Sequence, residues 1–145
     1  MRAIRNIAVG LPVKDGNVLV LEGRDDVKGQ DFYRAIGGGI EFGERAEQAL
    51  RREFIEELGM RLDGTELVGV FENLFTYEGE DAHEIAHIFA VTSRELDAVP
   101  LDAVLEVLDE GSPVRWVPIE SITAQHPLYP EGAPEALRAI IRVNS

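Results

Sequence analysis

Short apolar segments separated by turn-forming residues predict a protein built mainly from β-strands. Segments rich in β-branched and aromatic residues, bounded by clusters of Gly, Asp and Asn, are typical of strands joined by turns. On this pattern we predict strands at 4–13, 18–22, 32–36, 67–77, 83–92 and 114–119. The first two should form a hairpin around Lys14-Asp15-Gly16-Asn17. Loops are expected at 23–31, 78–81 and 95–109, the last with one or two turns of helix.

Two other segments have the 3.6-residue period of an amphipathic helix. In segment 45–58 an apolar residue recurs every four positions, at Ala46, Leu50, Phe54 and Leu58. Gly59 follows as the expected C-terminal stop. A second helix is predicted at 134–143, where apolar residues again fall at helical spacing. Strands combined with two principal helices predict an α/β fold with a mixed sheet between helical layers.

The polar face of the first helix concentrates carboxylates. At 100° per residue, Glu53, Glu56 and Glu57 share an arc of about 100°. Like charges at this spacing repel one another, so the helix is destabilised unless a cation neutralises them. Oxygen-only ligand sets suit hard divalent ions such as Mg²⁺ or Mn²⁺, which also chelate phosphates. Three glutamates alone are more simply explained as a solvated face; what favours a metal site is the fixed spacing of Gly38, Glu44, Arg52 and Gly59 around them.

Residues 38–60 resemble the Nudix box, G-x5-E-x7-R-E-U-x-E-E-x-G-U, in which U is a bulky aliphatic residue. The match runs through Gly38, Glu44, Arg52, Glu53, Phe54, Glu56, Glu57, Gly59 and Met60. Phe54 departs from its U position by carrying a ring, and Ile36 stands where many members have a proline before the glycines. The resemblance implies an α-β-α sandwich and a hydrolase that cleaves the pyrophosphate of a nucleoside diphosphate linked to another group.

The same resemblance implies roles for individual residues. Metal ligands would be the side chains of Glu53, Glu56 and Glu57 and the backbone carbonyl of Gly37. Arg52 would orient these glutamates, and Glu44 would either pair with Arg52 or accept hydrogen bonds from the first helical turn. Candidates for substrate binding are Arg34, Gly38, Gly39 and Tyr77.

The general base is left open between the box and a downstream acid. In this family it is either a box glutamate, here Glu53, or an acidic residue later in the chain. Glu110, six residues before Trp116, is the best downstream match and would also bind the metal. The remaining candidates are Glu106, Glu84 and Glu80.

Tyr77 directs the substrate prediction. Members that act on diadenosine polyphosphates often have tyrosine about sixteen residues past the box, where this chain has Phe75-Thr76-Tyr77. A tyrosine ring there could stack on a base. We therefore expect a dinucleoside polyphosphate or a nucleoside diphosphate sugar, with an oxidised or ordinary nucleoside triphosphate as the alternative.

The sequence also offers two alternatives from other functional classes. His83-Glu84-Ile85-Ala86-His87 spells H-E-x-x-H, the zinc-protease signature, which requires a helix. On a strand the two histidines stand about 13 Å apart and cannot share a zinc ion, and the strand formers that follow favour a strand. The second alternative is a non-catalytic Nudix-like nucleotide sensor, but such domains usually lose box glutamates, and here none is lost.

Length, composition and net charge limit the number of domains, the classes of partner and the kinds of site. The 145 residues are expected to form a single domain over 1–145. A net charge of −13 argues against nucleic-acid polymers and anionic membranes as partners. It also means that a metal ion must bridge the like charges of protein and polyphosphate. The chain has no cysteine for a disulfide or thiolate zinc site. Without a long apolar run or signal-peptide pattern, we expect a cytoplasmic protein; because small family members often pair, a homodimer is one expected oligomeric state.

Overall fold

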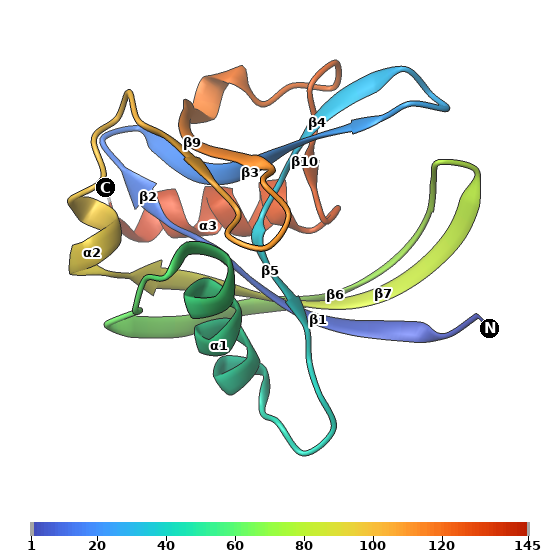
Figure 1. Cartoon of the computed structure of the whole chain (residues 1–145), viewed down its shortest axis with the longest axis horizontal. Coiled ribbons are helices and arrows are strands. Elements are labelled where there is room, and N and C mark those ends of the chain that lie inside the picture. Colours follow the sequence, from blue (N-terminus) through green and yellow to red (C-terminus); the bar gives the residue numbers. More distant parts are fainter. Residues whose placement is uncertain (1, 145) are drawn as a thin grey trace.

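Residues 2–144 are described by a computed structural model, in which two β-sheets lie between two long helices (Figure 1). The elements, in chain order, are β1 (Ile4–Leu11), β2 (Val13–Lys14), β3 (Asn17–Asp25), β4 (Gln30–Arg34), β5 (Ile36–Gly39), α1 (Ala46–Leu58), β6 (Gly64–Tyr77), β7 (Glu80–Thr92), α2 (Arg94–Asp97), β8 (Val104–Glu106), β9 (Pro113–Pro118), a 3₁₀ turn (Ile119–Ser121), β10 (Leu128–Tyr129) and α3 (Ala133–Asn144). This arrangement confirms the predicted α/β sandwich.

The strands divide into two sheets rather than one. The first has the order β5-β1-β7-β6 and is mixed, because β1 is parallel to β7 and antiparallel to β5. The second has the order β10-β4-β3-β9-β8, with β2 added to β3. Strands β4 and β5 follow one another with only Ala35 between them, so one segment links the two sheets.

The predicted hairpin between 4–13 and 18–22 is wrong for most of its length. Only Val13 and Lys14 pair with Val18 and Asn17, whereas β1 joins the other sheet. Pro12 explains the division, because it has no N–H to continue a ladder. Part of the expected loop at 23–31 is also strand, since β3 continues to Asp25 and β4 begins at Gln30.

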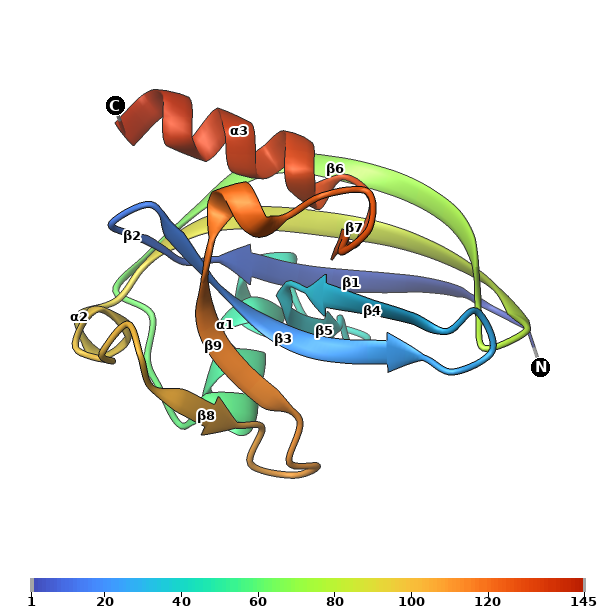
Figure 2. The same ribbon diagram turned by 90° about the horizontal axis from the view of Figure 1, so that it is seen from above.

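The two long helices cover opposite sides of the strands (Figure 2). Helix α1 buries the predicted positions Leu50, Phe54 and Leu58 against residues of both sheets, and Gly59 ends it in the left-handed conformation at φ 68°. Helix α3, close to its predicted range, buries Ala136, Leu137 and Ile140 against the other face. Across residues 2–144, no helix is long and apolar enough to cross a membrane.

Candidate active site

Three consecutive glycines bring β5 into close contact with both β1 and α1. A Cβ atom on Gly37, whose φ is +150°, would lie 2.1 Å from the carbonyl oxygen of Ala8. A Cβ atom on Gly38 would lie 2.7 Å from the carboxyl carbon of Glu53. The three glycines lie in strand β5, and their lack of side chains lets the Glu53 carboxylate rest on the backbone of Gly38.

Arg52 forms hydrogen bonds with strand β5, with the loop between β5 and α1, and with other residues of α1. Its Nε and Nη2 donate to the two carboxylate oxygens of Glu44, both at 2.8 Å. Its Nη1 donates to Glu53 at 2.9 Å, and its Nη2 also donates to the carbonyl of Gly39 at 2.9 Å. The bond to Arg52 lowers the pKa of Glu44 to about 2, and the same bond raises the pKa of Arg52. The predicted Arg52–Glu44 pair is thus present, and Arg52 fixes the position of Glu53.

The three helix carboxylates do not converge as the sequence suggested. Glu56 turns toward Arg52, with 3.2 Å between its Oε2 and Nη1, and its side chain is 54% exposed. The same Nη1 donates to Glu53 at 2.9 Å, so Glu53 and Glu56 share one guanidinium group. Glu57 takes no part in these bonds, and its Oε2 is buried without a hydrogen-bond partner. Arg52 can reach Glu56 because it lies one helical turn before it.

Burial and a neighbouring charge together make Glu57 a weak acid. Burial raises the pKa of Glu57 to about 8, and the charge of Glu53 adds to this effect. A smaller contribution comes from Asp109, while the positive charge of Arg34 acts in the opposite direction. Such a carboxyl pair favours protonation of one member until a cation neutralises both.

This pair of carboxylates fits a hard divalent cation. Within residues 2–144, no three His, Cys, Asp or Glu side chains come close enough to hold a metal ion by themselves. Mg²⁺, however, retains several waters and needs only one or two protein carboxylates. The buried, unpartnered oxygen of Glu57 beside Glu53 is the donor that such an ion requires. Roles for Glu56 and for the carbonyl of Gly37 as ligands stay predictions.

The loop between β8 and β9 contacts the end of α1. The backbone N–H of Leu108 donates to the carbonyl of Glu57 at 2.9 Å, which holds the loop beside the carboxylates. Glu110, the downstream base expected from the sequence, is exposed in this loop. Its neighbour Asp109 is the loop acid whose charge adds, after burial and Glu53, to the raised pKa of Glu57. Asp109 was not among the residues expected from the sequence, although it stands directly before Glu110.

The other candidate bases lie apart from the carboxylate pair. Glu106 is exposed on β8, and Glu80 is exposed at the start of β7. Glu84 is 6% exposed on β7, where its carboxylate faces Arg5 and Arg34.

Arg34 is close to Glu84 and acts on Glu57 through its charge. Its Nη2 is 3.9 Å from Oε2 of Glu84. Tyr77 is farther along β6, where its hydroxyl donates to the carbonyl of Arg24 at 3.4 Å and its ring meets Phe32 edge-on. Both partners of Tyr77 belong to the chain itself, so a base-stacking role for Tyr77 stays a prediction.

The H-E-x-x-H segment lies in β7, as predicted. The two histidines have different partners: Nε2 of His83 is 3.6 Å from Glu72, and Nδ1 of His87 is 3.3 Å from the carbonyl of Ile7. An extended backbone separates the two rings, so they cannot form the zinc site of a metalloprotease.

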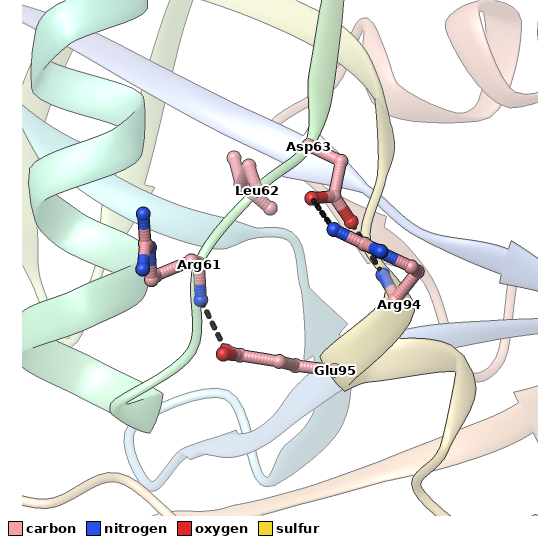
Figure 3. A pocket seen from close by; sticks show the side chains of 5 residues that line it. All are labelled: Arg61, Leu62, Asp63, Arg94 and Glu95. Carbon is pink, nitrogen blue, oxygen red and sulfur yellow. Dashed lines mark hydrogen bonds and ion pairs between the residues drawn. The ribbon is translucent and has the colours of Figure 1, made fainter.

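The residues that line a separate surface hollow near the end of α1 hold two segments of the chain together. Figure 3 shows its lining residues, Arg61, Leu62, Asp63, Arg94 and Glu95. Glu95 accepts the backbone N–H of Arg61 at 2.6 Å, and Asp63 accepts the backbone N–H of Arg94 at 2.7 Å. These reciprocal bonds join the segment after α1 to the start of α2, which explains the charges without a ligand.

Comparison with known proteins agrees with this geometry. A family model described as NUDIX domain matches residues 4–140. The chain is 34% identical over 125 residues to the nucleoside triphosphatase NudI of Escherichia coli, covering 81% of this chain and 84% of that protein. It is 33% identical over 112 residues to a Mycobacterium tuberculosis protein named as a mutator protein, MutT4, covering 77% of this chain but only 43% of that relative's length.

A solved structure shows the same fold. The MutT NUDIX hydrolase from Burkholderia pseudomallei superposes with a TM-score of 0.67 at 21% identity, covering 94% of this chain and 98% of the other. Nudix hydrolases generally need divalent metal ions and act on small nucleotide substrates. With the family model matching nearly the whole chain, the protein belongs to the NUDIX domain family, whose hydrolases act on phosphoric anhydride bonds.

Proposed function

We propose that this Nudix hydrolase is a nucleotide pyrophosphohydrolase that uses Mg²⁺ or Mn²⁺ held by Glu53 and Glu57. The single observation that carries this site is the buried, unpartnered Oε2 of Glu57 next to the carboxylate of Glu53. A buried acceptor without a partner is costly for a folded protein, and a cation would satisfy it.

Each residue then has a defined task. Bound at this pair, a divalent ion would neutralise charge on the phosphate oxygens and make a bound water more acidic. Arg52 holds Glu53 in place, while Glu44 and Gly39 hold Arg52. Glu57 carries a proton at neutral pH when no cation is bound, because its pKa is about 8. Glu53 is the first candidate for the general base, with Glu110 and the newly placed Asp109 as loop alternatives.

The substrate is proposed to be a nucleoside triphosphate, cleaved to a monophosphate and pyrophosphate. The name of the E. coli relative, a nucleoside triphosphatase covered over 84% of its length, favours this class. Nucleoside diphosphates linked to a sugar or a second nucleoside were favoured by the sequence through Tyr77, and they rank second because Tyr77 has partners within the chain. The single domain over 1–145, the cytoplasmic location and the homodimer stay predictions.

A substrate panel tests the proposal. The purified chain is incubated with each of four nucleoside triphosphates, an oxidised triphosphate, diadenosine polyphosphates and nucleoside diphosphate sugars, with Mg²⁺ or Mn²⁺, and products are identified by mass. We expect Glu53→Gln and Glu57→Gln to abolish turnover. Glu47→Gln is the matched control, because Glu47 lies on the same helix but is exposed and pairs with Arg51. Full turnover in both box variants would overturn the assignment of the metal site.

A further inference from the structure

A buried polar pair lies across β6 and β7, outside the carboxylate site. Asn73 is 4% exposed and Glu84 is 6% exposed. They are direct cross-strand partners, so their side chains point to the same face of the sheet. Arg5 is the partner of Glu84 on the other side, in β1. Buried polar residues are uncommon unless their hydrogen-bonding groups are used.

The hydrogen-bonding capacity of this pair is largely unused within the chain. The Nδ2 atom of Asn73 is buried and has no hydrogen-bond partner. Oε2 of Glu84 is 3.8 Å from Arg5 and 3.9 Å from Arg34, distances longer than a hydrogen bond. The two guanidinium groups face the carboxylate without donating a hydrogen bond to it. An orphaned amide donor beside a carboxylate with free acceptor sites therefore indicates a ligand that supplies the missing partners.

Arg34 connects this pair to the catalytic carboxylates. It is 3.9 Å from Glu84, and its charge also acts on Glu57. It lies just before β5, whose Gly38 supports Glu53. A nucleotide with its phosphates at the carboxylates would therefore extend past Arg34 toward Glu84.

The turns that flank this region are fastened to each other. Lys28 donates to the carbonyl of Thr76 at 2.8 Å, and the N–H of Glu78 donates to Asp25 at 3.0 Å. Figures 1 and 2 both show the β3–β4 and β6–β7 turns side by side. These bonds fix the separation of the two hairpins, so the groups between them are preorganised.

We propose that Glu84 and Asn73 recognise the Watson–Crick edge of a guanine base. An ionised carboxylate offers two acceptors, and the amide of Asn73 adds a donor beside them. The Watson–Crick edge of guanine presents the complementary set, namely the N1–H and N2–H donors beside the O6 acceptor. Adenine and cytosine place a donor beside an acceptor and lack the second adjacent N–H donor. This inference rests on the proposed nucleotide hydrolysis and specifies its base.

The wild-type enzyme provides the first test. With Mg²⁺ we expect kcat/KM for GTP to exceed that for ATP by at least about tenfold, since a good bidentate contact discriminates by about 5- to 150-fold. ITP lacks only the 2-amino group, so its kcat/KM should fall about tenfold or more below that of GTP. Equal rates for GTP and ITP, or preference for another base, would overturn the guanine assignment while leaving pyrophosphohydrolysis established.

Variants test the two residues. In Glu84→Gln the ratio of GTP to ATP turnover should fall toward one, because an amide replaces one acceptor by a donor; Asn73→Leu should reduce the ratio in the same direction. Glu72→Gln should keep the wild-type ratio, since Glu72 is exposed on the same strand and pairs with His83. Circular dichroism checks folding, and if a variant does not fold, the GTP and ITP comparison decides alone.

Binding without metal separates the two proposals. If no nucleotide is cleaved with either metal, the proposed function fails, and GMP and AMP binding to the metal-free protein is measured by NMR. Tighter binding of GMP that is lost in Glu84→Gln would support the guanine site. Equal binding of both monophosphates, or of neither, would refute it.

Discussion

Glu57 should make the metal-free protein lose stability as pH rises. Burial raises the pKa of Glu57 from 4.5 to about 8 in the folded state. Below pH 4.5 the group is protonated in both folded and unfolded chains and contributes nothing to the pH dependence. Between the two values the unfolded chain releases its proton while the folded chain retains it, so stability falls as pH rises. Above pH 8 the loss is complete.

The size of the loss follows from the shift. At about 1.4 kcal/mol per pH unit, a rise from 4.5 to about 8 corresponds to an upper bound of about 5 kcal/mol. Glu57 is only partly buried, and solvent screens part of its interaction with Glu53. We therefore expect about half of that bound, 2–3 kcal/mol. For a domain of this size such a change corresponds to about 4–12 °C in Tm.

Thermal unfolding of Glu57→Gln in EDTA measures this loss. Glutamine resembles the protonated acid but cannot ionise, so the variant should match the wild type at pH 5 and have the higher Tm at pH 8.5. Excess Mn²⁺ or Mg²⁺ should raise the Tm of the wild type at pH 8.5 and leave that of the variant nearly unchanged. Glu47→Gln, exposed on the same helix, is the control. A variant that is less stable than the wild type at pH 8.5 without metal would refute the assignment of Glu57 as a strained buried acid.

Three further substitutions test the parts that support the site. Gly38→Ala would place a methyl group 2.7 Å from the Glu53 carboxyl carbon and should lower kcat about 100-fold by displacing Glu53, with Tm showing that the fold persists. Arg52→Lys loses the forked contact with Glu44 and should reduce kcat or metal affinity about 10- to 100-fold; unchanged metal titrations would contradict the orienting role. Asp25→Asn replaces one of the oxygens that accept the N–H groups of Val27, Lys28 and Glu78, so Tm should fall by about 3–10 °C, as measured by calorimetry.

The parts of the fold that depend on local sequence were predictable. The apolar period of α1 and its glycine stop gave the helix almost to its ends, and the strand formers after His87 placed H-E-x-x-H on a strand. The sheet partners were not predictable in this way. Pairing of β1 with β5 and β7 joins segments far apart in the chain, and no local pattern distinguishes it from a hairpin with β3. The splitting into two sheets depends on Pro12 and on the β4–β5 junction acting together.

The candidate site shows the same difference between features set by local sequence and features set by distant parts of the chain. Helix geometry alone placed Glu53 and Glu57 together, and it also placed Arg52 one turn from Glu56. It could not show which partner Glu56 would choose, because that depends on the position of Glu44 in the preceding loop. Asn73 was missed altogether, since a single amide in an apolar strand gives no signal until its cross-strand partner is known.

The distribution of charge explains why a cation is central to this site. The arginines around the site are already occupied by acids: Arg52 contacts Glu44, Glu53 and Glu56, and Arg34 faces Glu84. They position carboxylates and leave little positive charge for a polyphosphate. A chain of net charge −13 also repels such a substrate at a distance. Attraction must then come from the divalent ion itself, and the proton that Glu57 carries in its absence is the group that the ion would replace.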